Sequence, residues 1–219
     1  MPLWEHVPDG EPRVFEHNGV KRVYVYGSHD IERKHYCGRD YVVWSAPVDD
    51  LTDWTYHGVA YETHYDSVLY APDVVKKGYT YYMYAAERAG SLIVAASSKT
   101  PWGPFENPVE TKLGVYEPNN GFLSYRFSDS PFGQFHDGGD ISFNGGEILE
   151  DGDGCGTMTY RWGNNHGLIA QINGKWYVFY HRHTAVNEFS RQAMMEPIDV
   201  AMGKDGMRAI STEAATKHT

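Results

Sequence analysis

Hydrophobic and polar residues alternate along much of the chain in short runs that turn residues separate. The clearest pair of runs is formed by residues 168–172 and 175–183, with Asn173-Gly174 between them. An Asn-Gly pair between two runs rich in β-branched and aromatic residues is a strong hairpin signal, because both residues tolerate the positive φ of a type I′ turn. The pattern predicts a β-hairpin that begins beside His166, in a Gly-rich stretch that lets the backbone crowd close to another segment.

Most of the chain reads as further strand pairs of two kinds. We name the hairpin kind the inner half-unit; it recurs at residues 11–27 and 69–84. The second kind, the outer half-unit, begins with strands at residues 41–47, 92–97 and 123–128, and its second strands are expected at residues 54–58, 101–105 and 131–135. An inner followed by an outer half-unit makes a four-stranded meander that recurs at about the period of propeller blades. The pattern predicts an all-β fold, a β-propeller.

The repeat has a gap. Its order is inner, outer, inner, outer, outer, inner, followed by a weaker outer half-unit at residues 189–210. Residues 108–121 leave no room for an inner half-unit, so at least half a blade is absent and the propeller is incomplete. Residues 144–161 are rich in Gly and acidic residues without periodicity, which indicates a long surface loop. At 219 residues the chain is expected to be a single domain.

Amino-acid composition limits the classes of partner that the chain is expected to bind. Aromatic residues make up 15% of the chain, which suits β-sheets and surfaces that stack on sugars or bases. The net charge of -10 and the lack of a basic run weigh against nucleic acid, so the substrate is expected to be neutral or cationic. With only Cys37 and Cys155, no disulfide framework is expected. No membrane-spanning run occurs and the start lacks signal-peptide features, which predicts a cytoplasmic protein unless a leader was removed.

A set of short motifs distributed over the chain resembles glycoside hydrolase family 43, the five-bladed propeller hydrolases that remove arabinofuranosyl and xylosyl units from plant polysaccharides. The motifs are specific as a set, whereas each alone is weak. They are Asp9-Gly10-Glu11-Pro12, Tyr26-Gly27-Ser28-His29-Asp30, Trp44-Ser45-Ala46-Pro47, Tyr70-Ala71-Pro72-Asp73, Ser128-Asp129-Ser130-Pro131, Asn164-Asn165-His166-Gly167, Phe179-Tyr180-His181-Arg182 and Phe189-Ser190-Arg191-Gln192.

The resemblance implies an inverting hydrolysis with an aspartate base, a second aspartate that tunes pKa values, and a glutamate acid. Asp73 matches the tuning carboxylate, and either Asp9 or Glu11 matches the base. His166 matches a histidine on the propeller axis beside a bound calcium ion or its waters, and Arg191 matches an arginine that reaches the sugar. No organic cofactor is implied.

The chain departs from the family pattern at the general acid. In the family, the acid glutamate belongs to an inner half-unit directly before the outer half-unit that ends in Ser-Asp-Ser-Pro, and this chain lacks that half-unit. Compared with a typical member, the chain looks internally deleted between about Gly114 and Tyr116, by about a blade and a half. Glu117 lies at this point but aligns after the missing strands, so it is not assigned as the acid.

Each candidate also has a structural interpretation. Asp73 after Pro72 is a turn carboxylate on that interpretation, and His166 is a buried histidine that donates to a carbonyl. Trp44 and Tyr70 are candidate sugar platforms, whereas Trp102 and Trp176 are expected in the core.

Two hypotheses from different classes follow. The first is a small arabinofuranosidase or xylosidase that acts on pentose-containing oligosaccharides, weakened by loss of the acid strand. The second is a non-catalytic propeller remnant that binds such oligosaccharides. Because an incomplete propeller leaves strand edges and an apolar blade face uncovered, a homo-oligomer is expected in both cases.

Overall fold

The computed structural model describes residues 7, 9–29, 37–112, 122–145, 148–149, 157–158, 165–172, 174–183, 191–202 and 208–210. Regular structure in these residues is β-strand apart from one 3₁₀ turn, Arg88–Gly90, which confirms the all-β prediction. The chain divides into two compact units. Unit 1 comprises Met1–Leu113 and Asp129–Gln134, and unit 2 comprises Gly114–Ser128 and Phe135–Thr219.

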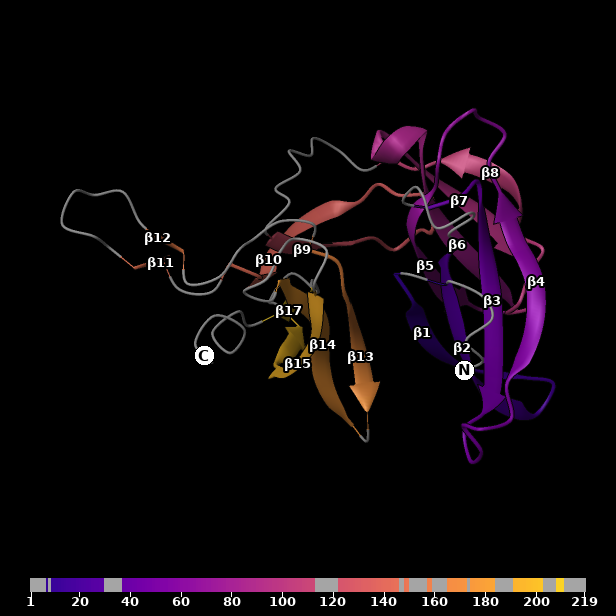
Figure 1. The fold of residues 1–219 in the computed structure, drawn as a ribbon, viewed down its shortest axis with the longest axis horizontal. Coiled ribbons are helices and arrows are strands. Elements are labelled where there is room, and N and C mark those ends of the chain that lie inside the picture. Colours follow the sequence, from indigo (N-terminus) through magenta and orange to yellow (C-terminus); the bar gives the residue numbers. More distant parts are fainter. Residues whose placement is uncertain are drawn as a thin grey trace. The chain divides into compact units, whose positions relative to one another are not determined.

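Unit 1 contains two complete four-stranded antiparallel meanders (Figure 1). The first sheet consists of β1 (Glu11–His17), β2 (Val20–Ser28), β3 (Asp40–Pro47) and β4 (Thr55–Glu62), in that order. The second consists of β5 (Tyr70–Lys77), β6 (Thr80–Glu87), β7 (Leu92–Ser98) and β8 (Glu106–Glu110), in that order. Both blades predicted from the first four half-units are therefore confirmed, and two inner strands begin at the expected residues, Glu11 and Tyr70.

The two sheets of unit 1 pack on a shared core that is rich in tyrosine. The rings of Tyr24, Tyr26, Tyr41 and Tyr81 are at most 1% exposed, and residues of both sheets join them. A buried tyrosine needs a partner for its hydroxyl. The hydroxyl of Tyr26, for example, donates to the Pro101 carbonyl. Trp102 packs against this core, as expected.

Two expected second strands are wrong. Residues 101–105 and 131–135 form turns and extended connections, and the strands that follow them begin at Glu106 and His136. Gly103 has φ 87 and lies so close to Ala60 that an added Cβ would be 3.0 Å from the Ala60 carbonyl oxygen. The aromatic residue that follows, Phe105, is 4% exposed, so the hydrophobic residues of this segment anchor a turn instead of a strand.

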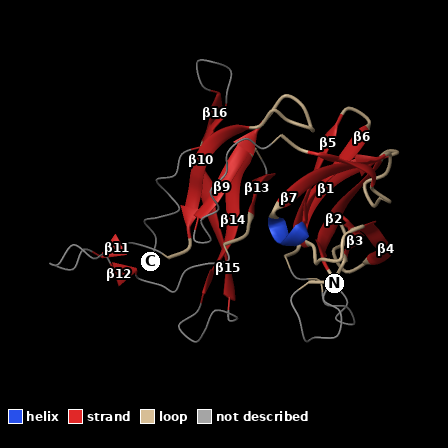
Figure 2. Ribbon diagram, turned by 90° about the horizontal axis from the view of Figure 1, so that it is seen from above, coloured by secondary structure: helices blue, strands red, loops and turns tan. Residues whose placement is uncertain are grey.

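Unit 2 contains smaller sheets (Figure 2). Its strands are β9 (Phe122–Phe127), β10 (His136–Phe143), β11 (Ile148–Leu149), β12 (Thr157–Met158), β13 (Leu168–Ile172), β14 (Lys175–His183), β15 (Arg191–Ile198), β16 (Val200–Met202) and β17 (Arg208–Ile210). The predicted hairpin is present as β13–β14, and β15 adds a third strand to it. Residues 144–161 were expected to be only a loop, but their described part also pairs β11 with β12.

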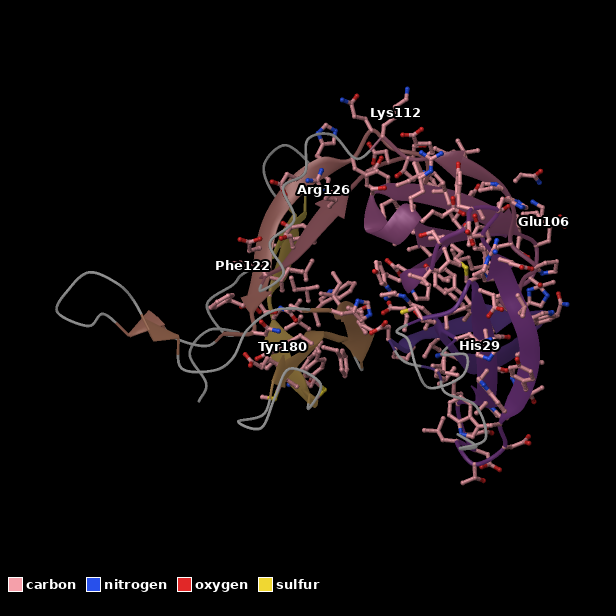
Figure 3. All side chains as sticks on the ribbon, turned by 45° about the horizontal axis from the view of Figure 1, so that its top comes forward. His29, Glu106, Lys112, Phe122, Arg126 and Tyr180 are labelled. Atoms are coloured by element: carbon pink, nitrogen blue, oxygen red, sulfur yellow. The ribbon has the colours of Figure 1, made fainter. Side chains whose placement is uncertain are left out.

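The predicted gap in the repeat is visible in the sheet order. Within the described residues, β9 and β10 form a two-stranded sheet without inner strands. A small apolar cluster forms the core of unit 2 and contains Ile141, Val178, Tyr180 and Ile198, with Trp176 packed against it as expected. Tyr180 of this cluster is labelled in Figure 3. Two complete blades followed by sheets of two and three strands are the sheet order of an incomplete propeller.

Candidate active site

Three ionisable side chains meet near the starts of the inner strands of unit 1. Glu11 is the first residue of β1, and Arg13 shares its face because side chains two apart on a strand point to the same side. Arg13 Nη2 lies 2.5 Å from Glu11 Oε1 and 2.6 Å from Asp73 Oδ1 on β5. We name these three residues the carboxyl cluster. Sequence reasoning missed Arg13, although its position two residues after Glu11 in an inner strand was a usable signal.

The nearest oxygens of the two carboxyl groups of the cluster are closer together than the spacing of an inverting acid and base. Because one Arg13 nitrogen contacts both, Glu11 Oε1 and Asp73 Oδ1 are separated by no more than the sum of the two distances, about 5.1 Å. An inverting acid and base are roughly 6.5–9.5 Å apart, so that a water fits between them. Glu11 and Asp73 are therefore not spaced as an acid–base pair of that kind.

Burial determines the protonation of Glu11. Its side chain is 2% exposed, whereas that of Asp73 is 48% exposed. Burial, and then the neighbouring Asp73 carboxylate, raise the pKa of Glu11 to about 9, although Arg13 opposes the shift. Burial alone would lower the pKa of Arg13, but Asp73 and Glu11 outweigh it and raise that pKa. Glu11 is thus protonated at neutral pH in this arrangement, so it must lose a proton before it can act as a base.

Asp9, the other candidate base, lies just before β1 in a half-buried bend. Its φ of 54 is in the left-handed region, which non-glycine residues adopt infrequently and Asp more readily than most. This backbone turn places Asp9 outside the strand, so its side chain does not follow the alternation that brings Glu11 and Arg13 to one face.

A short segment of unit 1 is attached to β5 and β6 near Asp73. Tyr84 pairs with Asp73 across the two strands, and its hydroxyl donates to the Pro131 carbonyl at 3.0 Å. Burial, and then Asp73, raise the pKa of Tyr84, so the hydroxyl remains a donor. Phe132 packs edge-on against Tyr82, with ring centroids 5.6 Å apart. The part of the Ser-Asp-Ser-Pro motif that belongs to unit 1 is thereby fixed on the blade that carries Asp73.

One of the two expected sugar platforms is corrected. Trp44 is 2% exposed and packs on Tyr56, with ring centroids 4.7 Å apart, so it is a core residue and offers no face to a sugar. Alternation along β3 did not reveal this, because six consecutive residues of that strand are buried. Tyr70 is 40% exposed at the start of β5, which is compatible with the role expected for it.

The remaining candidates belong to unit 2. His166 is half-buried just before β13, next to Gly167. A Cβ on Gly167 would lie 1.9 Å from the Phe179 carbonyl oxygen, so the close backbone approach predicted for this stretch is confirmed. Arg191 begins β15, and its side chain lies outside the described residues, as does Glu117.

The residues that the structure describes contain no group of three or more His, Cys, Asp or Glu side chains placed to hold a metal ion. No such group of side chains therefore lies beside His166 among the described residues. In the same residues, no helix is long and apolar enough to span a membrane.

No family model matches the chain. The chain is 31% identical to a protein named xylosidase/arabinosidase from Thermoclostridium stercorarium, over 304 positions that cover 91% of this chain and 63% of that protein. The chain thus spans less than two thirds of this relative. Since 91% of 219 residues is about 199, roughly 100 of the 304 positions have no counterpart in this chain. One blade repeat, from Glu11 to Tyr70, takes 59 residues, so the difference corresponds to between one and two blades.

Solved structures with a similar course of the chain include the RS223 β-xylosidase, with 18% identity, a TM-score of 0.46 and coverage of 95% of both chains. An α-L-arabinofuranosidase from Clostridium thermocellum has 21% identity and a TM-score of 0.49, with 95% of this chain and 96% of that chain covered. A family 43 β-xylosidase/α-arabinofuranosidase from a compost metagenome, in complex with xylotriose, has 20% identity, a TM-score of 0.45 and 97% coverage of both chains.

The chain is thus similar in sequence to a protein of the xylosidase/arabinosidase type. The name of this relative agrees with the resemblance to glycoside hydrolase family 43 that the motifs carry.

Proposed function

We propose that the chain is an inverting glycoside hydrolase that removes α-L-arabinofuranosyl or β-D-xylosyl units from plant polysaccharides and oligosaccharides. The carboxyl cluster carries this proposal, because a buried carboxyl and an exposed one meet where two inner strands begin. The name of the curated relative supports the substrate class.

The roles follow from the protonation of the cluster. A general base must be ionised to take a proton from the attacking water. Glu11, whose pKa is raised to about 9, must first lose a proton to meet this condition, and both Asp9 and Glu11 remain candidates. Asp73 tunes the pKa of Glu11 through its charge. Tyr70 offers an exposed ring to the sugar, and Arg191 is the candidate that contacts its hydroxyl groups.

The general acid is not located among the described residues. General-acid catalysis contributes typically about 10²–10⁴-fold to the rate, and aryl leaving groups need little protonation. We therefore expect slow release of nitrophenol from nitrophenyl α-L-arabinofuranoside or β-D-xyloside, with much weaker activity on natural oligosaccharides.

Nitrophenol release is the test. We expect Asp73→Asn to abolish it while the melting temperature changes little, because a half-exposed carboxylate contributes more to chemistry than to packing. Asp66→Asn is the matched control, since Asp66 is fully exposed in a loop of the same unit. Inversion is checked by NMR of the first sugar anomer released. Wild-type turnover that Asp73→Asn leaves unchanged would remove Asp73 from the site.

A second candidate function is binding of pentose-containing oligosaccharides without hydrolysis. The roughly 100 positions of the relative that have no counterpart in this chain favour it. For this function we expect a calorimetric titration to show binding of xylotriose, and we expect no nitrophenol release above the rate in buffer.

Calcium binding beside His166 remains part of the proposal. Calcium sites use six to eight oxygen ligands, so waters or residues outside the described ones must complete such a site. Added calcium should raise the melting temperature, and His166→Ala should remove that increase. An equal increase in the variant would place any bound calcium elsewhere.

A homo-oligomer is also proposed, because a two-stranded sheet such as β9–β10 is marginally stable without further strands. An obligate interface of this kind buries on the order of 2,000 Å² or more. Light scattering at micromolar concentration tests it, and a monodisperse species near 24.8 kDa would contradict it.

A further inference from the structure

Asp73 follows an irregularity in the pairing of β5 with β6. Tyr70 is paired with Ala86, but the next pair is Asp73 with Tyr84. Two β5 residues, Ala71 and Pro72, therefore face one β6 residue, which is a β-bulge. A bulge bends its strand and changes the direction of the next side chains, and Pro72 has no N–H for the regular ladder. The direction of the Asp73 side chain thus depends on how this bulge is held.

A side chain from the other sheet of unit 1 reaches the bulge. The Tyr41 hydroxyl, from β3, donates to the Tyr70 carbonyl and accepts from the Ala86 N–H at 3.2 Å. Tyr70 and Ala86 are the pair that borders the bulge, so one hydroxyl bridges the two strands there. Tyr41 is 0% exposed, and burial raises its pKa, so the hydroxyl keeps its proton and can donate and accept at once.

Beyond the bulge, the chain of contacts continues to the carboxyl cluster. Asp73 Oδ1 contacts Arg13, and the same Arg13 nitrogen contacts Glu11. A small rotation at the bulge would therefore change the distance from Asp73 to both partners. The ring of Tyr41 also stacks with Tyr61, with centroids 6.2 Å apart. The ring therefore packs in the core, whereas the hydroxyl makes hydrogen bonds to the residues that border the bulge.

We propose that Tyr41 is a positioning residue whose hydroxyl holds the β5 bulge and thereby places Asp73 beside Arg13 and Glu11. Its consequence for turnover rests on the proposed glycosidase function. The effect of Tyr41 on the carboxyl cluster does not rest on that function and can be measured without any substrate.

The decisive variant is Tyr41→Phe, which removes the hydroxyl and keeps the ring. The readout is the titration of Glu11, followed by NMR of the ¹³C-labelled carboxyl group in the full chain. If Asp73 moves away, Glu11 loses a neighbouring negative charge, and its midpoint should fall by roughly half a pH unit or more. Asp73→Asn should shift the same midpoint downward, because it removes that charge directly.

Tyr81→Phe is the matched control. Tyr81 is 1% exposed on β6, and its hydroxyl lies 3.5 Å from the Glu16 carbonyl oxygen and 3.3 Å from His17 Nδ1, toward the other end of the strand from Ala86. This variant loses a buried tyrosine hydroxyl from the same unit and should leave the Glu11 midpoint unchanged. Equal midpoints in wild type and Tyr41→Phe, or equal shifts in both tyrosine variants, would overturn the proposal.

Hydrogen exchange of the wild-type protein provides a test that needs no variant, in case Tyr41→Phe does not fold. The proposal requires the Ala86 N–H to be protected about as strongly as its neighbours on β6, and rapid exchange at this amide would overturn it. If wild type releases nitrophenol, Tyr41→Phe should lower kcat more than it changes KM. If wild type releases none, the glycosidase proposal fails, whereas the midpoint of Glu11 still decides the role of Tyr41.

Discussion

The two units of the chain differ in the number of strands in their sheets. Unit 1 closes two four-stranded blades around a core with several fully buried tyrosines. The described part of unit 2 has sheets of two and three strands around a smaller cluster. Small sheets need further packing for independent stability. The carboxyl cluster lies entirely in unit 1, the unit with two four-stranded sheets.

The starts of the inner strands show the same contrast. In unit 1, β1 and β5 carry near their starts the ionisable side chains of the carboxyl cluster, which meet one another. In unit 2, β13 begins after a glycine whose backbone lies against the neighbouring strand. Crowding is common to both units, but only in unit 1 do the described side chains at these starts form a cluster with acid–base chemistry.

Substituting this glycine should have the largest effect. We expect Gly167→Ala to destabilise the protein by at least about 3 kcal/mol, because the new Cβ would lie 1.9 Å from the Phe179 carbonyl oxygen and backbone cannot move aside cheaply. Gly10→Ala is the matched control before β1. Its Cβ would meet only the Val25 Cγ1 atom at 3.3 Å, so its cost should stay within about 1 kcal/mol. Urea unfolding measures both, and equal losses would contradict the contrast.

The second prediction uses pH to test the cluster in unit 1. The folded chain keeps a proton on Glu11 up to a pKa of about 9, whereas the unfolded chain releases it near 4.5. The folded state therefore binds more protons between these values, and stability falls as pH rises through this window. The loss is at most about 1.4 kcal/mol per pH unit. Calorimetry from pH 5 to 9 should show it, and Glu11→Gln should flatten the dependence. An unchanged slope in that variant would assign the effect to other groups.

Sequence predicted the blades well because strand alternation and two-residue turns are local signals. Asn18-Gly19 between β1 and β2, both with positive φ, is an example. Prediction from the sequence failed where the burial of a side chain decides its role. Trp44 has the kind of aromatic side chain that forms a sugar platform, but it lies in a strand that is buried on both faces. The protonation of Glu11 and the role of Tyr41 also escaped, because both depend on contacts between residues far apart in the chain.

A third prediction compares a pair of contacts that occurs in both units. The Tyr61 hydroxyl donates to the buried Glu87 in unit 1 at 2.5 Å, and the Tyr180 hydroxyl donates to the buried Glu196 in unit 2. The pairs differ in the second carboxylate oxygen. Among the described residues, Glu196 Oε2 is buried without a hydrogen-bond partner, whereas neither oxygen of Glu87 is in that position.

Removing the hydroxyl should therefore cost more in unit 2. We expect Tyr180→Phe to destabilise the protein by about 2 kcal/mol and Tyr61→Phe by about 1 kcal/mol. Both variants remove a hydroxyl donor from a buried carboxyl group, but only in Tyr180→Phe does the other oxygen of that group also lack a partner among the described residues. Chemical denaturation of the two variants under the same conditions measures the difference. The reverse order would show that Glu196 gains a partner in solution.

The smallest expected effect concerns the junction of the two blades in unit 1. His57 stacks on Trp102 of the neighbouring blade, with ring centroids 5.4 Å apart and 12° between the planes. Its Nε2 lies 2.7 Å from Ser45 Oγ, which accepts a hydrogen bond from Arg22 Nε at 2.9 Å. The serine hydroxyl is thus oriented to donate to a neutral His57. Burial, and then Arg22, lower the pKa of His57 below its usual 6.5.

The sign of this titration is opposite to that of Glu11. Below pH 6.5 the unfolded chain binds a proton at His57 that the folded chain resists, so stability is lost as pH falls through this window. Because the ring is half-buried, solvent screening should keep the loss under about 1 kcal/mol. His57→Gln should reduce the difference in unfolding free energy between pH 5 and pH 8, whereas His64→Gln, at an exposed site in the same unit, should not. Equal effects of the two variants would show that the contact between the blades does not depend on a neutral His57, and would leave Glu11 as the titrating group that distinguishes unit 1.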